Sequence, residues 1–223
     1  MPLDPLRTAM NTDPMHDDTA TPPPLLQVQG LRSRHGGPYD LAIGAAECVA
    51  VVGPSGSGKS VLLRLIADLD PHEGDVVLEG RSRTSWAPPQ WRRQVVYQSA
   101  EPAWWADTAS AHMNPNRLDD VAPMLAQLGL DNALLTADIA RLSTGERQRM
   151  ALVRSLSFQP RVLLLDEPTA ALDTASALAV EQLLRERMRS QGLAVAIVTH
   201  SPEQATRLAH RVFDVRNGQV HAR

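Results

Sequence analysis

The chain has 223 residues, of which 43% are hydrophobic and 21% charged, and its formal net charge is −3 at pH 7. This length and composition predict one ordinary globular domain with a substantial core. The slightly acidic balance argues against a nucleic-acid binder, whose contact surface is usually basic, and no apolar stretch reaches the roughly 18 residues that span a bilayer.

The N-terminal segment, residues 1–24, is rich in proline, aspartate and threonine. It lacks the charged and then apolar layout of a secretion signal. Its composition is typical of a disordered segment, so we expect one folded domain over residues 25–223.

A glycine-rich loop at residues 53–60 holds the only lysine of the chain. It matches the pattern G-x-x-x-x-G-K-[ST] with Gly53, Pro54, Ser55, Gly56, Ser57, Gly58, Lys59 and Ser60. In this pattern backbone N–H groups cradle phosphates, the ammonium reaches the β- and γ-phosphates, and the last hydroxyl ligates Mg²⁺. A buried strand before the loop (47–52) and a helix after it (60–67) supply the required context. A genome that prefers arginine codons explains the scarcity of lysine, but not its position, so we predict nucleotide binding here.

Residues 92–98 read as a short strand that ends in Gln98. A neutral amide at this point is able to contact both Mg²⁺ and water, although many glutamines end strands without such a role.

Two adjacent tryptophans, Trp104 and Trp105, follow in a polar loop. One alternative is that a tryptophan packs into a local core. The other is that one or both line a groove for a partner, since interfaces favour aromatic anchors.

A helix start is predicted at Ser143, which forms an S-x-x-E capping box with Glu146, and the helix should run to about Ser157. One interpretation is a plain helix cap. The other is an anion site, because a helix N-terminus with a serine hydroxyl and the N–H of Gly145 attracts phosphate. A second phosphate-seeking surface in a chain with a phosphate loop suggests that two copies sandwich the nucleotide.

Two further apolar strands are predicted near residues 161–166 and 194–198, and polar side chains follow both. Asp166 and Glu167 end the first strand, where α/β sheets place their ligands. We expect Asp166 to hold Mg²⁺, directly or through water, and Glu167 to polarise the attacking water. His200 follows the second strand and is placed to contact the γ-phosphate and orient Glu167. Taken alone, the acids or the histidine would suit a structural role equally well.

Taken together, these motifs resemble the ATP-binding cassette (ABC) ATPases over almost the whole chain from Leu25. The phosphate loop, the glutamine loop beginning at Gln98, LLLDEP at residues 163–168 and Thr199-His200 occur in the family's order. LSTGE, with Ser143, Thr144, Gly145 and Glu146, resembles the LSGGQ signature, and Asp173 falls in the D-loop. Thr144 stands where the family usually has glycine, so the loop must tolerate a β-branched residue.

The resemblance implies an α/β fold with a P-loop core, an N-terminal antiparallel β-subdomain and an α-helical signature subdomain at about residues 99–157. Helical patterns at residues 119–128 and 132–135 support the last of these. The family's adenine-stacking aromatic should fall near residues 34–36, where His35 is the first candidate and Tyr39 the second.

The resemblance also implies an Mg²⁺-dependent ATP hydrolase that acts as a head-to-tail homodimer or paired cassette. In each site Lys59 binds phosphate, Ser60, Gln98 and Asp166 hold Mg²⁺, Glu167 and His200 act in catalysis, and the signature comes from the opposite copy.

Such a subunit powers transport through a separate integral membrane partner, and so lies at the cytoplasmic face of the inner membrane. Small bacterial iron or metal efflux ATPases are one possible match, and import remains open. The alternatives are a soluble ABC ATPase of the assembly, repair or translation type and a non-enzymatic scaffold. Chromosome and repair types carry a long coiled-coil insertion and translation types two cassettes, neither of which is present.

Overall fold

A computed structural model describes residues 23–216 and 218–222. The expectation of disorder for residues 1–24 therefore falls almost entirely outside the described residues. No helix in the described part of the chain is both long and apolar enough to cross a membrane.

A six-stranded sheet forms the centre of the domain, in the order β10-β9-β3-β8-β7-β6. Its strands are β3 (Cys48–Val52), β6 (Val95–Gln98), β7 (Val162–Asp166), β8 (Ala194–Val198), β9 (Arg211–Arg216) and β10 (Gln219–Ala222). All neighbours run parallel except β9 and β10. The parallel strands therefore end at the same edge, where the phosphate loop and the two acids follow them.

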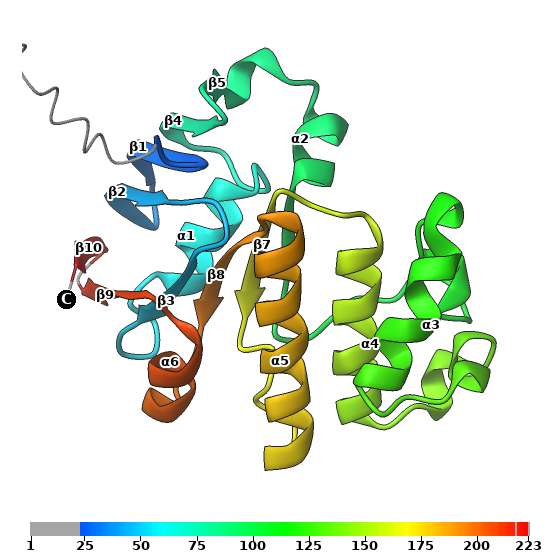
Figure 1. The fold of residues 1–223 in the computed structure, drawn as a ribbon. Coiled ribbons are helices and arrows are strands. Elements are labelled where there is room, and N and C mark those ends of the chain that lie inside the picture. The colour runs from blue at the N-terminus through cyan, green and yellow to red at the C-terminus, as the bar shows by residue number, and fades with distance from the viewer. Residues whose placement is uncertain (1–22, 217, 223) are drawn as a thin grey trace, which may run out of the picture.

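A second, antiparallel sheet of four strands has the order β2-β1-β4-β5. It contains β1 (Leu26–Ser33), β2 (Gly36–Ile43), β4 (Glu73–Leu78) and β5 (Arg81–Ser82). Figure 1 shows it at the N-terminal side of the molecule, in blue and cyan. The fold class expected from the sequence is thus confirmed, including the antiparallel part.

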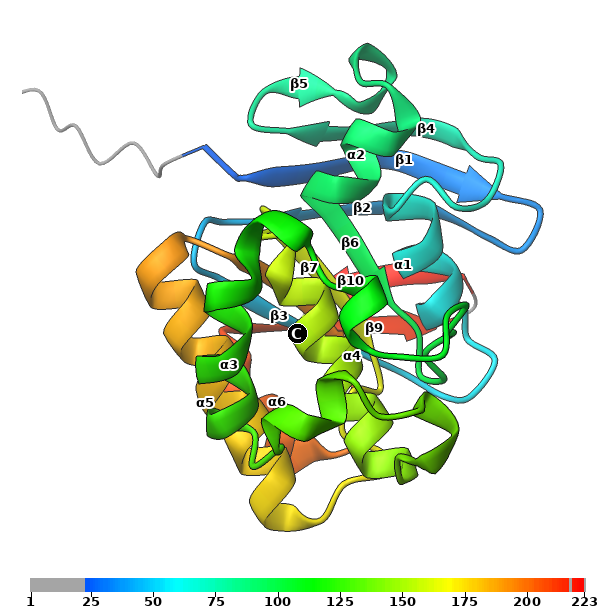
Figure 2. The same ribbon diagram turned by 90° about the vertical axis from the view of Figure 1, so that its right-hand side faces the viewer.

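The helices are α1 (Lys59–Ile66), α2 (Pro88–Gln94), α3 (Leu118–Gln127), α4 (Thr144–Ser157), α5 (Thr174–Gln191) and α6 (Pro202–Leu208). Short 3₁₀ turns join them, among them one at Asn132–Leu135. Figures 1 and 2 show α3 beside α4, on the side of the molecule away from the four-stranded sheet. The predicted helical patterns at 119–128 and 144–157 are confirmed to within a residue.

Two hydrophobic clusters cover the two faces of the central sheet, because alternate residues of a strand point to opposite sides. In β3, Cys48 and Ala50 pack with α3, α4 and α5, whereas Val49 and Val51 pack with α1 and the antiparallel sheet. Cys48 is fully buried and burial raises the pKa of its thiol to about 12, so it serves as a core group.

One sequence expectation needs correction. The strand predicted over residues 92–98 begins only at Val95, because residues 92–94 end helix α2, which starts at the favourable Pro88. The prolines at its first turn fit a helix start, since proline lacks the N–H that is unpaired there.

Candidate functional site

The phosphate loop joins the end of β3 to the start of α1 and takes backbone conformations that glycine alone adopts readily. Gly53 has a φ of +144°, and a Cβ there would lie 2.3 Å from the carbonyl oxygen of Val215. Gly58, with a φ of +104°, caps α1, and a Cβ there would lie 2.7 Å from the hydroxyl of Tyr39. Substituting either glycine would require the loop, or the Val215 or Tyr39 group that it contacts, to move.

Lys59 is only 6% exposed, which is unusual for a lysine. Its ammonium donates to the carbonyl oxygens of Gly53 (2.9 Å) and Pro54 (2.8 Å). These bonds hold the charge within the curve of the loop, while the side chain of Ser60, the next residue, is exposed. The ammonium and the hydroxyl are thus both at the loop, as the sequence pattern predicts.

The two candidates for adenine stacking have different positions. Tyr39 is fully buried in β2 with its hydroxyl beneath the loop, so its ring has no face to offer a base and that expectation is wrong. His35 is exposed in the turn between β1 and β2. It lines a cavity of about 510 Å³ together with Gly36, Arg216, Gly218 and residues 54–57 of the loop. His35 therefore remains a candidate, next to the phosphate loop.

The acid pair follows β7, whose register places Asp166 opposite Val198 of β8. Glu167 has a left-handed backbone with a φ of +48°, an uncommon conformation for a residue with a side chain. Its carboxylate lies 3.0 Å from Nε2 of His200, which follows β8. Neighbouring parallel strands thus bring together two residues that are 33 positions apart in the sequence, as the sequence analysis expected.

Asp166 and Gln98, the two residues expected to hold Mg²⁺ besides Ser60, have different hydrogen-bond partners. Asp166 is buried at the end of β7, and the hydroxyl of Tyr97 donates to its Oδ2 (3.1 Å). Burial and the nearby carboxylate raise the pKa of Tyr97, so its hydroxyl stays a donor. Gln98 is also buried, but its Oε1 accepts from Ser155 of α4 (3.3 Å) while its Nε2 has no partner among the described residues. The amide oxygen is therefore engaged with α4.

The oxygen donors near the phosphate loop suit Mg²⁺, which does not need a site made entirely of protein ligands. The described residues contain no group of three or more histidines, cysteines or acids that could hold a metal ion. Mg²⁺ usually binds one or two carboxylates together with substrate phosphates and water. The exposed hydroxyl of Ser60 and the carboxylate of Asp166 supply that kind of open donor set.

The predicted capping box is present at the start of α4. The Ser143 hydroxyl accepts the N–H of Glu146 (3.3 Å), and Oε2 of Glu146 accepts the backbone N–H of Ser143 (2.8 Å). The hydrogen bond from the Ser143 hydroxyl lowers the pKa of Glu146, so the box stays ionised. Thr144 is exposed at the first helical position, where its backbone is ordinary helix, so the glycine usual at this place is not needed.

Within the described residues, no hydrogen bond or ion pair joins the segment 143–146 to the phosphate loop. The signature instead packs against the D-loop of its own chain: a Cβ at Gly145 would lie 3.3 Å from Leu172 and 3.5 Å from the carbonyl oxygen of Ala171. Asp173 caps α5 by accepting the N–H of Ser176 (2.9 Å), which lowers its pKa.

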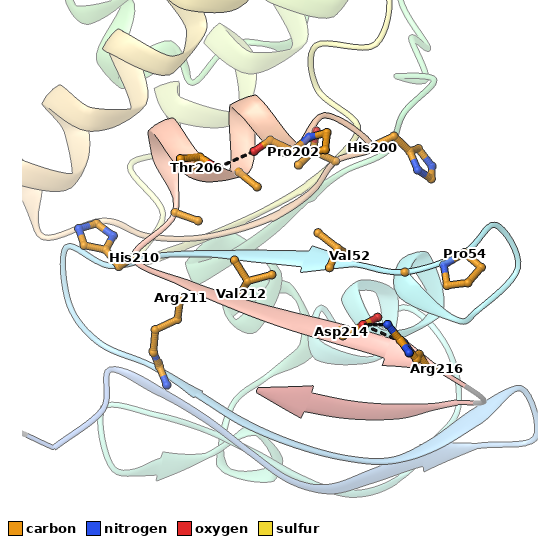
Figure 3. Close-up of a pocket in the computed structure, with 14 residues that line it drawn as sticks. Val52, Pro54, His200, Pro202, Thr206, His210, Arg211, Val212, Asp214 and Arg216 are labelled. Atoms are coloured by element: carbon orange, nitrogen blue, oxygen red, sulfur yellow. Dashed lines mark hydrogen bonds and ion pairs between the residues drawn. The ribbon is translucent and has the colours of Figure 1, made fainter. Parts of the chain in front are cut away.

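A cavity of about 770 Å³ lies between the start of the phosphate loop, α6 and β9. Figure 3 shows His200 and Pro54 at one end of it and His210 at the other. The ion pair of Arg216 with the buried Asp214 (2.7 Å) lies on the β9 side. The catalytic candidate His200 therefore borders an open space beside the phosphate loop.

The two tryptophans have different surroundings in the structure. Trp104 packs against the cluster that includes α3 and α4. Trp105 is 76% exposed, and its ring meets His112 edge-on at 4.3 Å between centroids. Trp105 lines a cavity of about 330 Å³ with Arg92, Arg93, Val96, Tyr97, His112, Arg154, Ser155 and Phe158, called here the Trp105 groove.

The sequence analysis missed Tyr97 and Gln148. Gln148 is buried in α4, and its amide contacts the backbone of Glu167 and Ala171. The available signal was a polar residue on the apolar face of a predicted helix, two positions after the signature. The motifs did not identify Gln148, because the residues it bonds are 19 and 23 positions away in the sequence.

Comparison with known proteins gives consistent results. Residues 37–170 match the model of a family described as ABC transporter. The chain is 36% identical over 195 residues to the probable iron export ATP-binding protein FetA of Escherichia coli (strain K12), covering 81% of this chain and 87% of that protein. It is 35% identical over 232 residues to the aliphatic sulfonates import ATP-binding protein SsuB 2 of Xanthomonas axonopodis pv. citri (strain 306), covering 96% and 74%.

Among solved structures, the ATP-binding cassette MJ0796, in a dimeric post-hydrolysis state bound to ADP and Pi, has a TM-score of 0.77 and 24% identity. The match covers 89% of this chain and 97% of that one. It shows that the two share a fold.

Proposed function

This chain belongs to the ABC transporter family as an ATP-binding, ATP-hydrolysing subunit that works with a membrane partner, and we propose from this premise that Glu167 and His200 are its catalytic pair. The observation that carries the proposal is the 3.0 Å contact between Glu167 Oε1 and His200 Nε2. The pair lies at the edge of the sheet where β3 enters the phosphate loop. Glu167 would orient and polarise the attacking water, and His200 would stabilise the transferring phosphoryl group.

The loop at 53–60 would bind the triphosphate. Its backbone N–H groups and the N-terminus of α1 attract phosphate oxygens, and Lys59 would exchange its carbonyl partners for the β- and γ-phosphates. His35 would lie beside the base, since it lines the same cavity as residues 54–57. Phosphoryl transfer requires positioning and charge stabilisation more than covalent chemistry, which suits this set of groups.

Mg²⁺ would neutralise charge on the β- and γ-phosphates when bound. Ser60 and Asp166 are the residues that would hold it, with Tyr97 keeping the Asp166 carboxylate in place through the 3.1 Å hydrogen bond. Gln98 would become a third Mg²⁺ ligand only after its amide oxygen gives up the hydrogen bond from Ser155, which requires a rotation of its side chain.

Two copies would close head to tail, with Ser143, Thr144, Gly145 and Glu146 of one facing the nucleotide of the other. Ser143 and Thr144 are exposed at a capped helix N-terminus, and no hydrogen bond among the described residues joins this segment to its own phosphate loop. The similar cassette MJ0796 is dimeric. Asp173, at the start of α5, would lie near the contact between the copies.

The Trp105 groove would receive a segment of the membrane partner, and the chain would then lie at the cytoplasmic face of the inner membrane. Trp105 and Phe158 are the exposed apolar groups there, at 76% and 37%. Arg92, Arg93 and Arg154 surround them, so an acidic or amphipathic segment fits best. A tryptophan among arginines is the composition that interface hot spots favour.

Replacing Trp105 with alanine should weaken binding to the membrane partner by about 2 kcal/mol or more, roughly 30-fold in affinity. ATP hydrolysis by the isolated chain should persist, because the groove is separate from the phosphate loop. The measurement is recovery of the tagged chain with membranes and the identity of the co-purifying integral protein. Leu118→Ala, at another exposed apolar residue in the helical region, is the matched control. Undiminished recovery of Trp105→Ala would discredit the groove.

Export of iron or another metal is the transport function we propose. The similarity to FetA covers 87% of that protein, compared with 74% for the sulfonate importer subunit. Cells that lack this chain should accumulate iron after an iron load, as measured by elemental analysis. Complementation with the wild-type gene should restore the lower content and Glu167→Gln should not. Unchanged iron together with failure to grow on an alkanesulfonate as sulfur source would identify import instead.

A further inference from the structure

Gln148 contacts two backbone groups on either side of the turn that follows β7. Its Nε2 donates to the carbonyl oxygen of Glu167 (2.8 Å), and its Oε1 accepts the N–H of Ala171 (3.3 Å). The side chain is buried, with the residue 4% exposed. Both ends of the amide are therefore used, and neither has water as a ready alternative.

The turn that Gln148 spans is strained at Glu167. Its φ of +48° costs energy for a residue with a side chain and persists only where the surroundings enforce it. The N–H of Glu167 is bonded to Val198 of β8 (3.0 Å), and its carbonyl oxygen also accepts the N–H of Ala170 (3.3 Å). Of the two bonds to that carbonyl oxygen, the one from Gln148 is the shorter, and it comes from a helix while the other comes from the turn itself.

Gln148 also lies on the face of α4 that carries the signature. Gly145 and Gln148 are three residues apart and so occupy one side of the helix. Gly145 packs on Ala171 and Leu172, and Gln148 bonds the N–H of Ala171. The orientation of Glu167 is thus set relative to α4 and not by its own strand alone.

We propose that Gln148 is a positioning residue for catalysis, which holds the Glu167 carboxylate against His200 and ties it to the signature helix. The inference rests on the proposed catalytic role of Glu167. Gln148 touches neither nucleotide nor water in this scheme; it acts through the backbone of Glu167. A displacement of about 1 Å at a catalytic group is enough to lower the rate by about 100-fold.

The test compares Gln148→Met with wild type in the full chain. We expect kcat to fall by about 100-fold while KM for ATP stays within about threefold, because contacts at the phosphate loop are untouched. ATP-dependent association and the melting temperature should show that the variant folds and binds. Ser157→Ala is the control. It removes a buried hydroxyl of the same helix; this hydroxyl accepts the N–H of Asn114 and has no hydrogen bond to Glu167 among the described residues. It should retain wild-type kcat.

A second variant, Gln148→Glu, gives a readout that does not depend on the stability of the fold. When ionised, the introduced carboxylate has no hydrogen to donate and repels the Glu167 carbonyl oxygen. When protonated, its hydroxyl donates to that oxygen and its carbonyl accepts the N–H of Ala171, which restores both bonds. Burial favours the protonated form by raising the pKa, so kcat relative to wild type should rise as pH falls from about 8 to about 6. The same ratio for Gln148→Met should not change with pH.

A kcat of Gln148→Met within about twofold of wild type would overturn the inference, since an effect that small is ordinary for a neutral site. So would a Gln148→Glu deficit that is the same at every pH. Failure of the proposed function would look different: the Glu167→Gln variant would then hydrolyse ATP at the wild-type rate, whatever Gln148 does.

Discussion

Glu167→Gln should bind ATP and lose turnover, with kcat about 10²- to 10⁴-fold lower. Glutamine has nearly the same shape, so the strained turn and the bonds from Gln148, Val198 and Ala170 to its backbone are retained. Its neutral amide lacks the negative charge that polarises a water molecule and pairs with His200. Steady-state phosphate release and equilibrium ATP binding measure the two halves of this result.

The matched control is Glu186→Gln, which makes the same chemical change on α5, where the carboxylate bonds only Gln127 and is exposed. It should hydrolyse ATP like wild type. Undiminished hydrolysis by Glu167→Gln would remove Glu167 from the catalytic site.

The same variant should reveal the dimer, because ATP then remains bound between two signatures. We expect association that depends on ATP, a population shift from open to closed copies, measured by light scattering after size exclusion. Adding Ser143→Arg should abolish it, since a large side chain would occupy the space of the partner's phosphates. Asp131→Arg, at an exposed cap elsewhere in the helical region, introduces the same arginine side chain and should have no effect. A monomer at saturating ATP would exclude the sandwich.

Lys59→Ala should weaken ATP binding by ~10- to 100-fold, which corresponds to losing hydrogen bonds from one charged group, at ~1.5–3 kcal/mol. The ammonium is the only lysine in the chain and lies buried within the phosphate loop. Equilibrium binding of a fluorescent ATP analogue would measure the loss.

Lys59→Arg separates charge from shape in the same assay. The guanidinium keeps the charge but is planar and larger, and the site is 6% exposed, so we expect it to bind ATP poorly as well. Wild-type affinity in Lys59→Ala, with an unchanged melting temperature, would contradict the assignment of the loop.

Local patterns predicted the parts of the site that depend on neighbours in sequence. The loop at 53–60 is closed by hydrogen bonds from the Lys59 ammonium to the carbonyl oxygens of Gly53 and Pro54, and in the Ser143–Glu146 box each residue bonds the other's backbone N–H. Both arrangements are complete within a few residues, so composition and spacing were sufficient. The parallel strands before Asp166 and His200 were predictable for the same reason, since each is a short apolar run.

Long-range packing decided what the patterns left open or got wrong. The burial of Tyr39 beneath Gly58 removes it as a base-stacking residue, and the bond of Gln98 to Ser155 turns its amide towards α4. The start of α2 at Pro88 shortens the strand before Gln98. Each of these outcomes depends on a partner that is distant in sequence, and no spacing rule identifies such a partner.

The sequence by itself determined the glycine-rich loop at 53–60 and the capped start of α4 at Ser143, because those motifs are closed by local hydrogen bonds. The sequence also predicted that His200 would meet Glu167, but only the tertiary structure decided that Gln148 of α4 holds the backbone of Glu167. The physical reason is that a catalytic orientation is set by contacts between elements, whose energies come from burial and hydrogen bonds across the fold.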